Sequence, residues 1–249
     1  FMTQYEAIIE ALKNAGGVAT LGQLYSDVLK IPGCKWKSKT PFASIRCTLQ
    51  RKPAFYKIRP GLYGLVDMRK SIESRGIMVE TPKNKNSSDI SIFNHSYFQG
   101  LLLLIGNMKN MKTFVPNQDK NRKFYDGRKL GELATLHEQP NYSYDSFVKR
   151  SSTIDTIWFG EREMPHSFFE IEHSTDIQNS LLKFNDLQDF YVRMVIVADS
   201  NRKEEFKAKM NYSSFDELRK NNRVNFLSYS TLTKQYEQEL EKQKYELVL

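Results

Sequence analysis

The first 66 residues place apolar and polar side chains in the pattern of short helices followed by a hairpin. Apolar positions recur every three or four residues in three segments that each start at a threonine able to cap a helix, namely Thr3–Asn14, Thr20–Leu29 and Thr40–Gln50. Two further apolar runs, Phe55–Arg59 and Leu62–Val66, flank Pro60-Gly61, a pair typical of tight turns. The pattern therefore predicts three helices and a terminal hairpin.

The rest of the chain alternates helix-like and strand-like segments. Residues 68–90 are rich in Ser, Asn and Lys and show little periodicity, which predicts a linker between a domain over 1–67 and a second over 91–249. A continuous apolar run at Tyr191–Ala198 is typical of a buried central strand. The other predicted strands are Lys112–Pro116 and Val224–Leu227, and the predicted helices are Ser91–Met111, Arg128–His137, Thr175–Phe190, Asn201–Met210 and Ser230–Tyr245. The expected fold class is α/β (α+β), with a mixed sheet flanked by helices.

Three carboxylates fall in two apolar runs that a polar turn joins. Asp155 lies in Ile154–Phe159, and Glu170 and Glu172 lie in Ser167–His173. Alternate residues of a strand share a face, so the two glutamates point the same way, and Asp155 joins them if the strands pair. Such close acids raise one another's pKa unless a cation lies between them, and Mg²⁺ prefers oxygen ligands. The alternative is that these acids line the solvent face of an ordinary hairpin.

The order of these acids resembles the PD-(D/E)xK nuclease active site. Ile154-Asp155 stands at the Pro-Asp position and Glu170-Ile171-Glu172 at the E-x-K position, so a glutamate replaces the lysine, as in E-x-E variants among type II restriction endonucleases. The run F-E-I-E-H-S-T-D-I-Q-N-S-L-L-K-F-N-D-L, residues 169–187, also resembles a segment of one restriction-nuclease branch. The resemblance implies Mg²⁺, which Mn²⁺ could replace, held by Asp155, Glu170, the Ile171 carbonyl and Glu172.

Lys183 is a fourth candidate catalytic residue beside the three carboxylates. It lies where the resembling branch carries arginine, so it could approach a phosphate or take the place of the missing strand lysine. A solvated helix lysine is an equal alternative. His95, His137 and His166 are isolated in the sequence and are predicted to be surface or core residues rather than ligands. His173 should face the opposite side of the strand from the carboxylates.

A second resemblance covers residues 3–66. The segment K-T-P-F-A-S-I-R-C-T-L-Q-R-K-P-A-F-Y-K-I-R-P-G-L-Y-G-L, residues 39–65, resembles the HARE-HTH domain, a winged-helix module found with restriction endonucleases and chromatin proteins. In such domains the third helix enters the major groove and the hairpin touches backbone, while Ile45 and Leu49 would pack inward. The candidates for phosphate or base contacts are Lys37, Lys39, Thr40, Ser44, Arg46, Gln50, Arg51, Lys52 and Lys57. The alternative is the solvated basic face of a protein-binding module.

The positive charge is concentrated in this first segment. The chain has a net charge of +8, and residues 1–66 hold ten Lys/Arg and three acidic residues, a net of +7, which favours a polyanionic partner. Two cysteines without a C-x-x-C motif predict reduced thiols in a cytoplasmic protein. The aliphatic run Leu101–Ile105 is far too short to span a bilayer, and no export leader opens the sequence.

The two resemblances together imply a Mg²⁺-dependent type II restriction endonuclease that hydrolyses double-stranded DNA at a specific sequence. Cutting both strands needs two active sites, which predicts a homodimer. The chain shows no methyltransferase motif, so a cognate DNA methyltransferase is expected as a separate protein. Two alternatives remain open at this point. One is a catalytically inactive winged-helix DNA-binding regulator, which the absent lysine favours, and the other is an RNA or structure-specific nuclease.

Overall fold

The computed structural model describes residues 2–36 and 40–246. The chain divides into two compact units. Unit 1 comprises Phe1–Phe93, Tyr125–Gly127 and Tyr236–Leu249, and unit 2 comprises Asn94–Phe124 and Arg128–Gln235. Across the described ranges, every helix is too short or too polar to cross a membrane.

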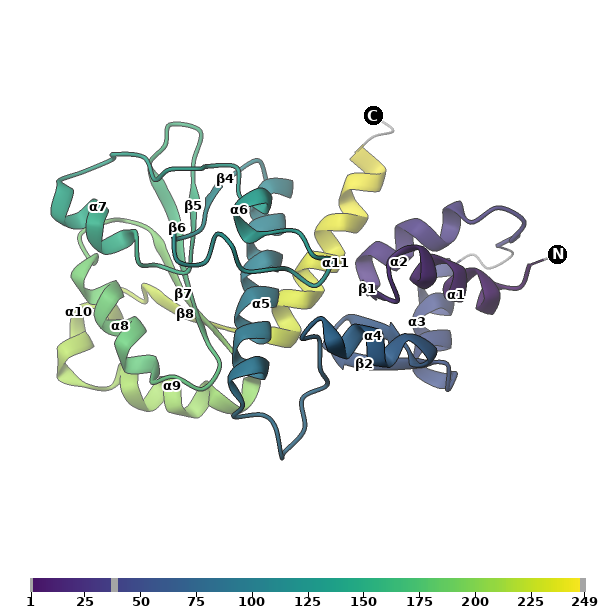
Figure 1. Ribbon diagram of the computed structural model, residues 1–249. Coiled ribbons are helices and arrows are strands. Elements are labelled where there is room, and N and C mark those ends of the chain that lie inside the picture. The colour runs from purple at the N-terminus through teal and green to yellow at the C-terminus, as the bar shows by residue number, and fades with distance from the viewer. Residues whose placement is uncertain (1, 37–39, 247–249) are drawn as a thin grey trace. The chain divides into compact units, whose positions relative to one another are not determined.

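Unit 1 opens with three helices and a small antiparallel sheet (Figure 1). The helices are α1 (Gln4–Asn14), α2 (Leu21–Asp27), which continues into the 3₁₀ turn η1 (Val28–Lys30), and α3 (Pro41–Arg51). The strands β1 (Val18–Thr20), β2 (Phe55–Arg59) and β3 (Leu62–Leu65) pair in the order β1-β3-β2. Thr3 and Glu6 form a capping box at the start of α1, in which the Thr3 N–H donates to Glu6 Oε2 at 2.7 Å.

The predicted helices and hairpin of unit 1 are present, and Ile45 and Leu49 are buried as expected. Strand β1 is absent from the predictions because three residues are too few to show an alternation. The 3₁₀ turn η2 (Val66–Met68) leads into the segment predicted as a linker, where the chain forms helix α4 (Arg69–Ser74). Ile72 of α4 is fully buried, so this segment contributes an apolar contact.

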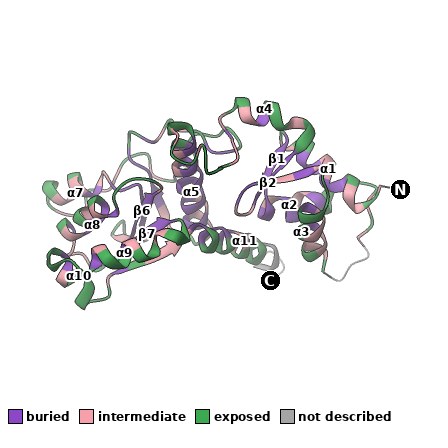
Figure 2. Ribbon diagram, turned by 90° about the horizontal axis from the view of Figure 1, so that it is seen from below, coloured by how far each residue is buried: buried purple, intermediate pink, exposed green. Residues whose placement is uncertain are grey.

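A five-stranded mixed sheet lies at the centre of unit 2. Its strands, in the order β4-β5-β6-β7-β8, are β4 (Lys112–Phe114), β5 (Thr156–Phe159), β6 (Pro165–Glu172), β7 (Arg193–Ala198) and β8 (Val224–Ser228). The pairs β4–β5 and β5–β6 are antiparallel, and β6–β7 and β7–β8 are parallel. Strands β6 and β7 are largely buried (Figure 2), and the continuous apolar run of β7 is typical of such a central strand.

Helices cover both faces of this sheet. On one face, α8 (Ile177–Asp186), α9 (Lys203–Met210) and α10 (Asp216–Lys220) form a core with Ile157, Phe159 and Phe168. Trp158 points to the other face because successive strand residues alternate. There its Nε1 donates to the Leu102 carbonyl of α5 (Ser88–Met108) at 3.0 Å. The remaining elements are α6 (Leu130–Leu133), α7 (Asp145–Ser151), η3 (Ser200–Arg202), η4 (Ser213–Phe215) and α11 (Tyr229–Glu246).

Unit 2 differs from its prediction in local details. Helix α6 covers four residues of the ten expected over 128–137, and helix α7 is absent from the predictions. Helix α7 has only Phe147 and Val148 as apolar residues, which gives no helical stripe. Asp155 lies just before β5 rather than inside the strand, so a loop residue supplies the first carboxylate.

Gly106 allows α5 to lie close to the sheet. A Cβ at this position would stand 2.5 Å from Thr113 Cγ2 and 2.6 Å from Trp158 Nε1. We expect Gly106→Ala to lower the free energy of unfolding by about 1–3 kcal/mol, because overpacking outweighs the roughly 1 kcal/mol gain in helix propensity. Urea unfolding measures this, with Gly160→Ala as control, since its Cβ would meet nothing closer than 3.9 Å. Equal stability of wild type and Gly106→Ala would contradict this close approach.

Candidate active site

The candidate carboxylates meet where β5 begins and β6 ends. The antiparallel register sets Thr156 of β5 opposite Phe169 of β6, so the preceding residue, Asp155, lies beside the carboxyl end of β6. There Asp155 Oδ2 accepts a hydrogen bond of 2.7 Å from the Ile171 N–H. Asp155, Glu170 and Glu172 are all buried. These acids therefore do not line the solvent face of a hairpin.

Ser180 of α8 joins the two glutamates. Its Oγ donates to Glu170 Oε2 at 2.8 Å and also contacts Glu172 Oε1. A hydroxyl carries one hydrogen, so Ser180 can donate to only one of these two carboxylates at a time. Thr175 Oγ1 donates to the other oxygen of Glu172. The two carboxylates thus share a side of the sheet and lie close enough to compete for one donor.

Lys183 forms an ion pair with Glu170. Its Nζ lies 2.8 Å and 3.0 Å from the two carboxylate oxygens and donates to the Thr153 carbonyl at 3.0 Å. The lysine side chain is 23% exposed and the glutamate side chain 3%, so this lysine is not the solvated one that the sequence left open. Lys183 and Ser180 are three residues apart on one face of α8, which presents both to β6.

The buried acids have perturbed affinities for protons. Burial raises the pKa of Asp155, against the opposing charge of His95 and the Ile171 N–H. Burial also raises the pKa of Glu170 well above its usual range, and the charge of Asp155 adds to this while Lys183 opposes it. Burial likewise raises the pKa of Glu172. An added cation would relieve this crowding of negative charge, and the oxygen donors suit a hard divalent ion.

A second group shares Asp155 and could hold a metal ion. His95, Asp119 and Asp155 each offer a ligand atom, and these atoms all lie within 4.8 Å of one another. The sequence predicted His95 to be a surface or core residue rather than a ligand; in the structure its Nε2 lies 3.5 Å from an oxygen of each aspartate, and its role as a ligand stays untested. Burial lowers the pKa of His95, but the charges of Asp155 and Asp119 outweigh it and the pKa is raised.

Sequence patterns alone hardly predict this second group. Asp119 lies in the irregular segment between β4 and α6, where no spacing connects it to His95 or Asp155. One signal was present in the sequence. His95 and Gln99 are four residues apart on the predicted helix Ser91–Met111, so two polar side chains share one face of that helix. His173 contacts Asn94, with 2.9 Å between Nδ1 and the Asn94 amide nitrogen.

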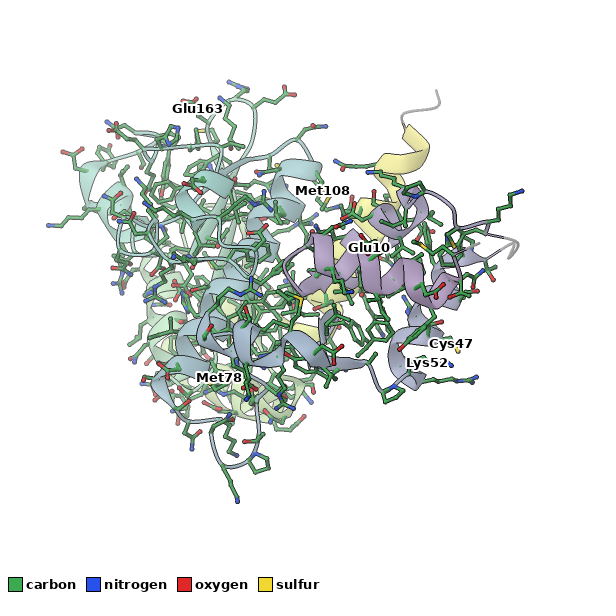
Figure 3. All side chains as sticks on the ribbon, turned by 45° about the vertical axis from the view of Figure 1, so that its right-hand side comes forward. Glu10, Cys47, Lys52, Met78, Met108 and Glu163 are labelled. Carbon is green, nitrogen blue, oxygen red and sulfur yellow. The ribbon has the colours of Figure 1, made fainter. Side chains whose placement is uncertain are left out.

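A surface groove in unit 2 lies away from these acids. It has a volume of about 1280 Å³ and includes the β5–β6 turn around Glu161 together with Arg193 and Arg223. Figure 3 labels Glu163 in the same turn, and this residue pairs with Lys112 at 2.7 Å. None of the buried carboxylates lines the groove. Side-chain chemistry, rather than the shape of the surface, therefore locates the candidate site.

The described candidates for nucleic-acid contacts in unit 1 lie on α3, at its two caps and on β2. Lys37 and Lys39 fall outside the described residues. Ser44 is half-buried, and its Oγ lies 3.4 Å from the Thr40 carbonyl. Arg46 pairs with Glu237 at 3.1 Å and is 51% exposed. The other exposed candidates are Thr40, Gln50, Arg51, Lys52 (Figure 3) and Lys57.

Comparison with known proteins gives two matches. The sequence profile of the family described as "Type II restriction enzyme NmeDI C-terminal domain" matches residues 78–247. The type II restriction enzyme NmeDI of Neisseria meningitidis serogroup C is 28% identical over 138 residues, which are 51% of this chain and 39% of that protein. The aligned region thus covers about two fifths of that relative's length. No solved structure matches the chain.

Proposed function

Because the chain belongs to the type II restriction enzyme NmeDI C-terminal domain family, we propose that it is a Mg²⁺-dependent type II restriction endonuclease acting on double-stranded DNA. The match over residues 78–247 includes every carboxylate of the candidate site together with Lys183. The single observation that carries the proposal is the contact of Lys183 with Glu170 beside Asp155. A lysine from α8 thereby supplies the cation that the E-x-E strand lacks.

The proposed roles follow from these contacts. Asp155, Glu170, the Ile171 carbonyl and Glu172 would hold Mg²⁺, which would acidify the attacking water and neutralise charge on the scissile phosphate. Ser180 lies between Glu170 and Glu172 and can orient either one by donating its single hydroxyl hydrogen to it. Lys183 favours the ionised form of Glu170, since its ammonium opposes the effect of burial on the pKa of that carboxyl. The same ammonium offers a positive charge to a phosphate.

Unit 1 would bind the DNA. We assign residues 1–67 as a winged-helix domain on the order of its helices and hairpin, with residues 91–249 as a PD-(D/E)xK nuclease domain. The exposed basic residues of α3 and β2 would contact phosphates, which makes the affinity dependent on salt. A homodimer would place two active sites on the duplex, and base methylation would be the task of a separate enzyme.

Cleavage of DNA tests the proposal directly. Methylated and unmethylated phage DNA is incubated with the full chain and Mg²⁺, beside Glu170→Ala and the control Glu161→Ala, an exposed acid of the β5–β6 turn. We expect discrete fragments from wild type and the control, and none from Glu170→Ala. If no protein cuts with Mg²⁺ or Mn²⁺ but all retard duplex DNA in a gel, the chain is a non-catalytic DNA-binding protein. Preferred cutting of RNA or branched DNA would point to a different nuclease class.

A further inference from the structure

His95, Asp119 and Asp155 come from three separate parts of unit 2. His95 lies on α5, Asp119 on the segment between β4 and α6, and Asp155 just before β5. His95 Nε2 is 3.5 Å from Asp119 Oδ2 and 3.5 Å from Asp155 Oδ1. These separations exceed the usual length of a hydrogen bond, about 2.7–3.2 Å. With metal–ligand bonds of about 2.0–2.2 Å, neighbouring ligand atoms around one ion lie about 3–3.5 Å apart, so the spacing suits a shared cation.

Each aspartate turns one oxygen toward His95 and has its other oxygen beside a group of the protein, the Ile171 N–H or the Arg122 guanidinium. Asp155 Oδ2 accepts the Ile171 N–H at 2.7 Å, which leaves Oδ1 toward the histidine. Asp119 Oδ1 lies 2.8 Å from Arg122 Nε, which leaves Oδ2 toward the histidine. Protein groups that hold the outer atom of a ligand in this way orient the inner atom toward a metal. The two carboxylates are therefore positioned before any ion binds.

The side-chain amide of Gln99, which contacts both aspartates, is independent evidence for a ligand at this group. Its side chain is fully buried, and its Nε2 donates to Asp119 Oδ2 at 3.2 Å and also to the Asp155 carbonyl. Its Oε1 has no hydrogen-bond partner within the described part of the chain. A buried amide oxygen without a donor is costly, by about 1–3 kcal/mol. A water ordered by a cation at the aspartates would supply that donor.

We infer that His95, Asp119 and Asp155 form a second cation site, which shares Asp155 with the nuclease site and takes a first-row transition ion such as Mn²⁺, Co²⁺ or Zn²⁺. Oxygen ligands alone suit Mg²⁺, whereas an imidazole nitrogen suits Co²⁺ and Zn²⁺, and Mn²⁺ accepts a mixed nitrogen and oxygen set more readily than Mg²⁺ does. Asp155 can serve both sites because Oδ1 faces His95, while Oδ2 accepts the Ile171 N–H with one lone pair and keeps a second lone pair for the nuclease site. The site uses neither Glu170 nor Lys183, so it does not depend on the proposed cleavage.

Mn²⁺ binding to the full chain, without DNA, tests this site. Free Mn²⁺ is counted by its electron paramagnetic resonance signal while excess Mg²⁺ occupies oxygen-only sites. We expect one Mn²⁺ to stay bound per chain, and His95→Ala to weaken its binding by about 10–100-fold or more. His95→Gln, which keeps the size of the side chain, should behave in the same way. The control His137→Ala replaces an exposed histidine and should bind Mn²⁺ like wild type.

Two results would overturn the inference. One is Mn²⁺ affinity in both His95 variants equal to that of wild type, with circular dichroism showing that all variants are folded. The other is wild type that retains no Mn²⁺ in the presence of Mg²⁺. DNA cleavage is not part of this measurement. A chain that binds Mn²⁺ through His95 but cuts no DNA would keep this site while the proposed nuclease function fails.

Discussion

Asp155→Asn is expected to abolish DNA cleavage and, in the metal-free protein, to increase stability. Asp155 would be a ligand in both cation sites, and metal ions stabilise the charge of phosphodiester hydrolysis by several kcal/mol. Each ~1.4 kcal/mol corresponds to a tenfold change in rate, so cleavage should fall about a thousandfold or more. Asparagine has nearly the same shape and can still accept the Ile171 N–H, so the fold should persist.

The gain in stability follows from the raised pKa of Asp155. Burial disfavours the ionised carboxylate in the folded chain, so its charge opposes folding at neutral pH. Removing that charge should raise the free energy of unfolding by about 0.5–2 kcal/mol, a usual gain for a stabilising substitution. The control Asp189→Asn changes an exposed aspartate and should leave stability within about 0.5 kcal/mol of wild type.

The difference in the free energy of unfolding between Asp155→Asn and wild type should depend on pH with a definite sign. A carboxyl whose pKa is raised by folding destabilises the native state fully above the folded pKa. As pH falls through the folded pKa toward the ordinary value, the native state takes up a proton and the cost disappears. The stability of Asp155→Asn and wild type should therefore converge in acid. Chemical unfolding in EDTA at several pH values measures this, and a gap that widens in acid would contradict the explanation.

The carboxylate pair on β6 could be predicted from sequence because strand geometry alone places it. Glu170 and Glu172 are two residues apart, and alternation puts them on one side of any strand. Burial of these acids could not be predicted, because it depends on α8 covering that side of the sheet. The contact of Glu170 with Lys183 was one of several options in the sequence, since helical spacing shows which residues share a face but not which strand they meet.

The group of His95, Asp119 and Asp155 could not be predicted from the sequence. Its three members are separated by 24 and 36 positions in the printed sequence, and each lies on a different segment. Only the tertiary packing of α5 and the 117–129 segment against the start of β5 brings them together. A single sequence contains no periodicity for such contacts. The same holds for α7, whose few apolar residues become a core contact only through Phe147.

Lys183→Met is expected to lower the rate of DNA cleavage by about 10²–10⁴-fold while DNA binding persists, because positioned charges and proton carriers contribute on this scale. Methionine keeps the length of the side chain and removes the ammonium, so Glu170 loses its buried partner. Stability should fall by about 1–3 kcal/mol. This is less than the ~3–5 kcal/mol of a fully buried pair, because the Lys183 side chain is 23% exposed.

Two matched variants separate a catalytic role for Lys183 from a merely structural one. Lys183→Arg keeps a cation beside Glu170, so stability should recover, and cleavage should recover with it if charge at this position is what the reaction needs. Lys203→Met removes an exposed lysine of α9 and should change neither property. The measurements are cleavage rates under single-turnover conditions and gel retardation in Ca²⁺. If Lys183→Met cuts as fast as wild type although its stability is reduced, Lys183 is only a structural partner of Glu170, and the water must be activated by the carboxylates alone.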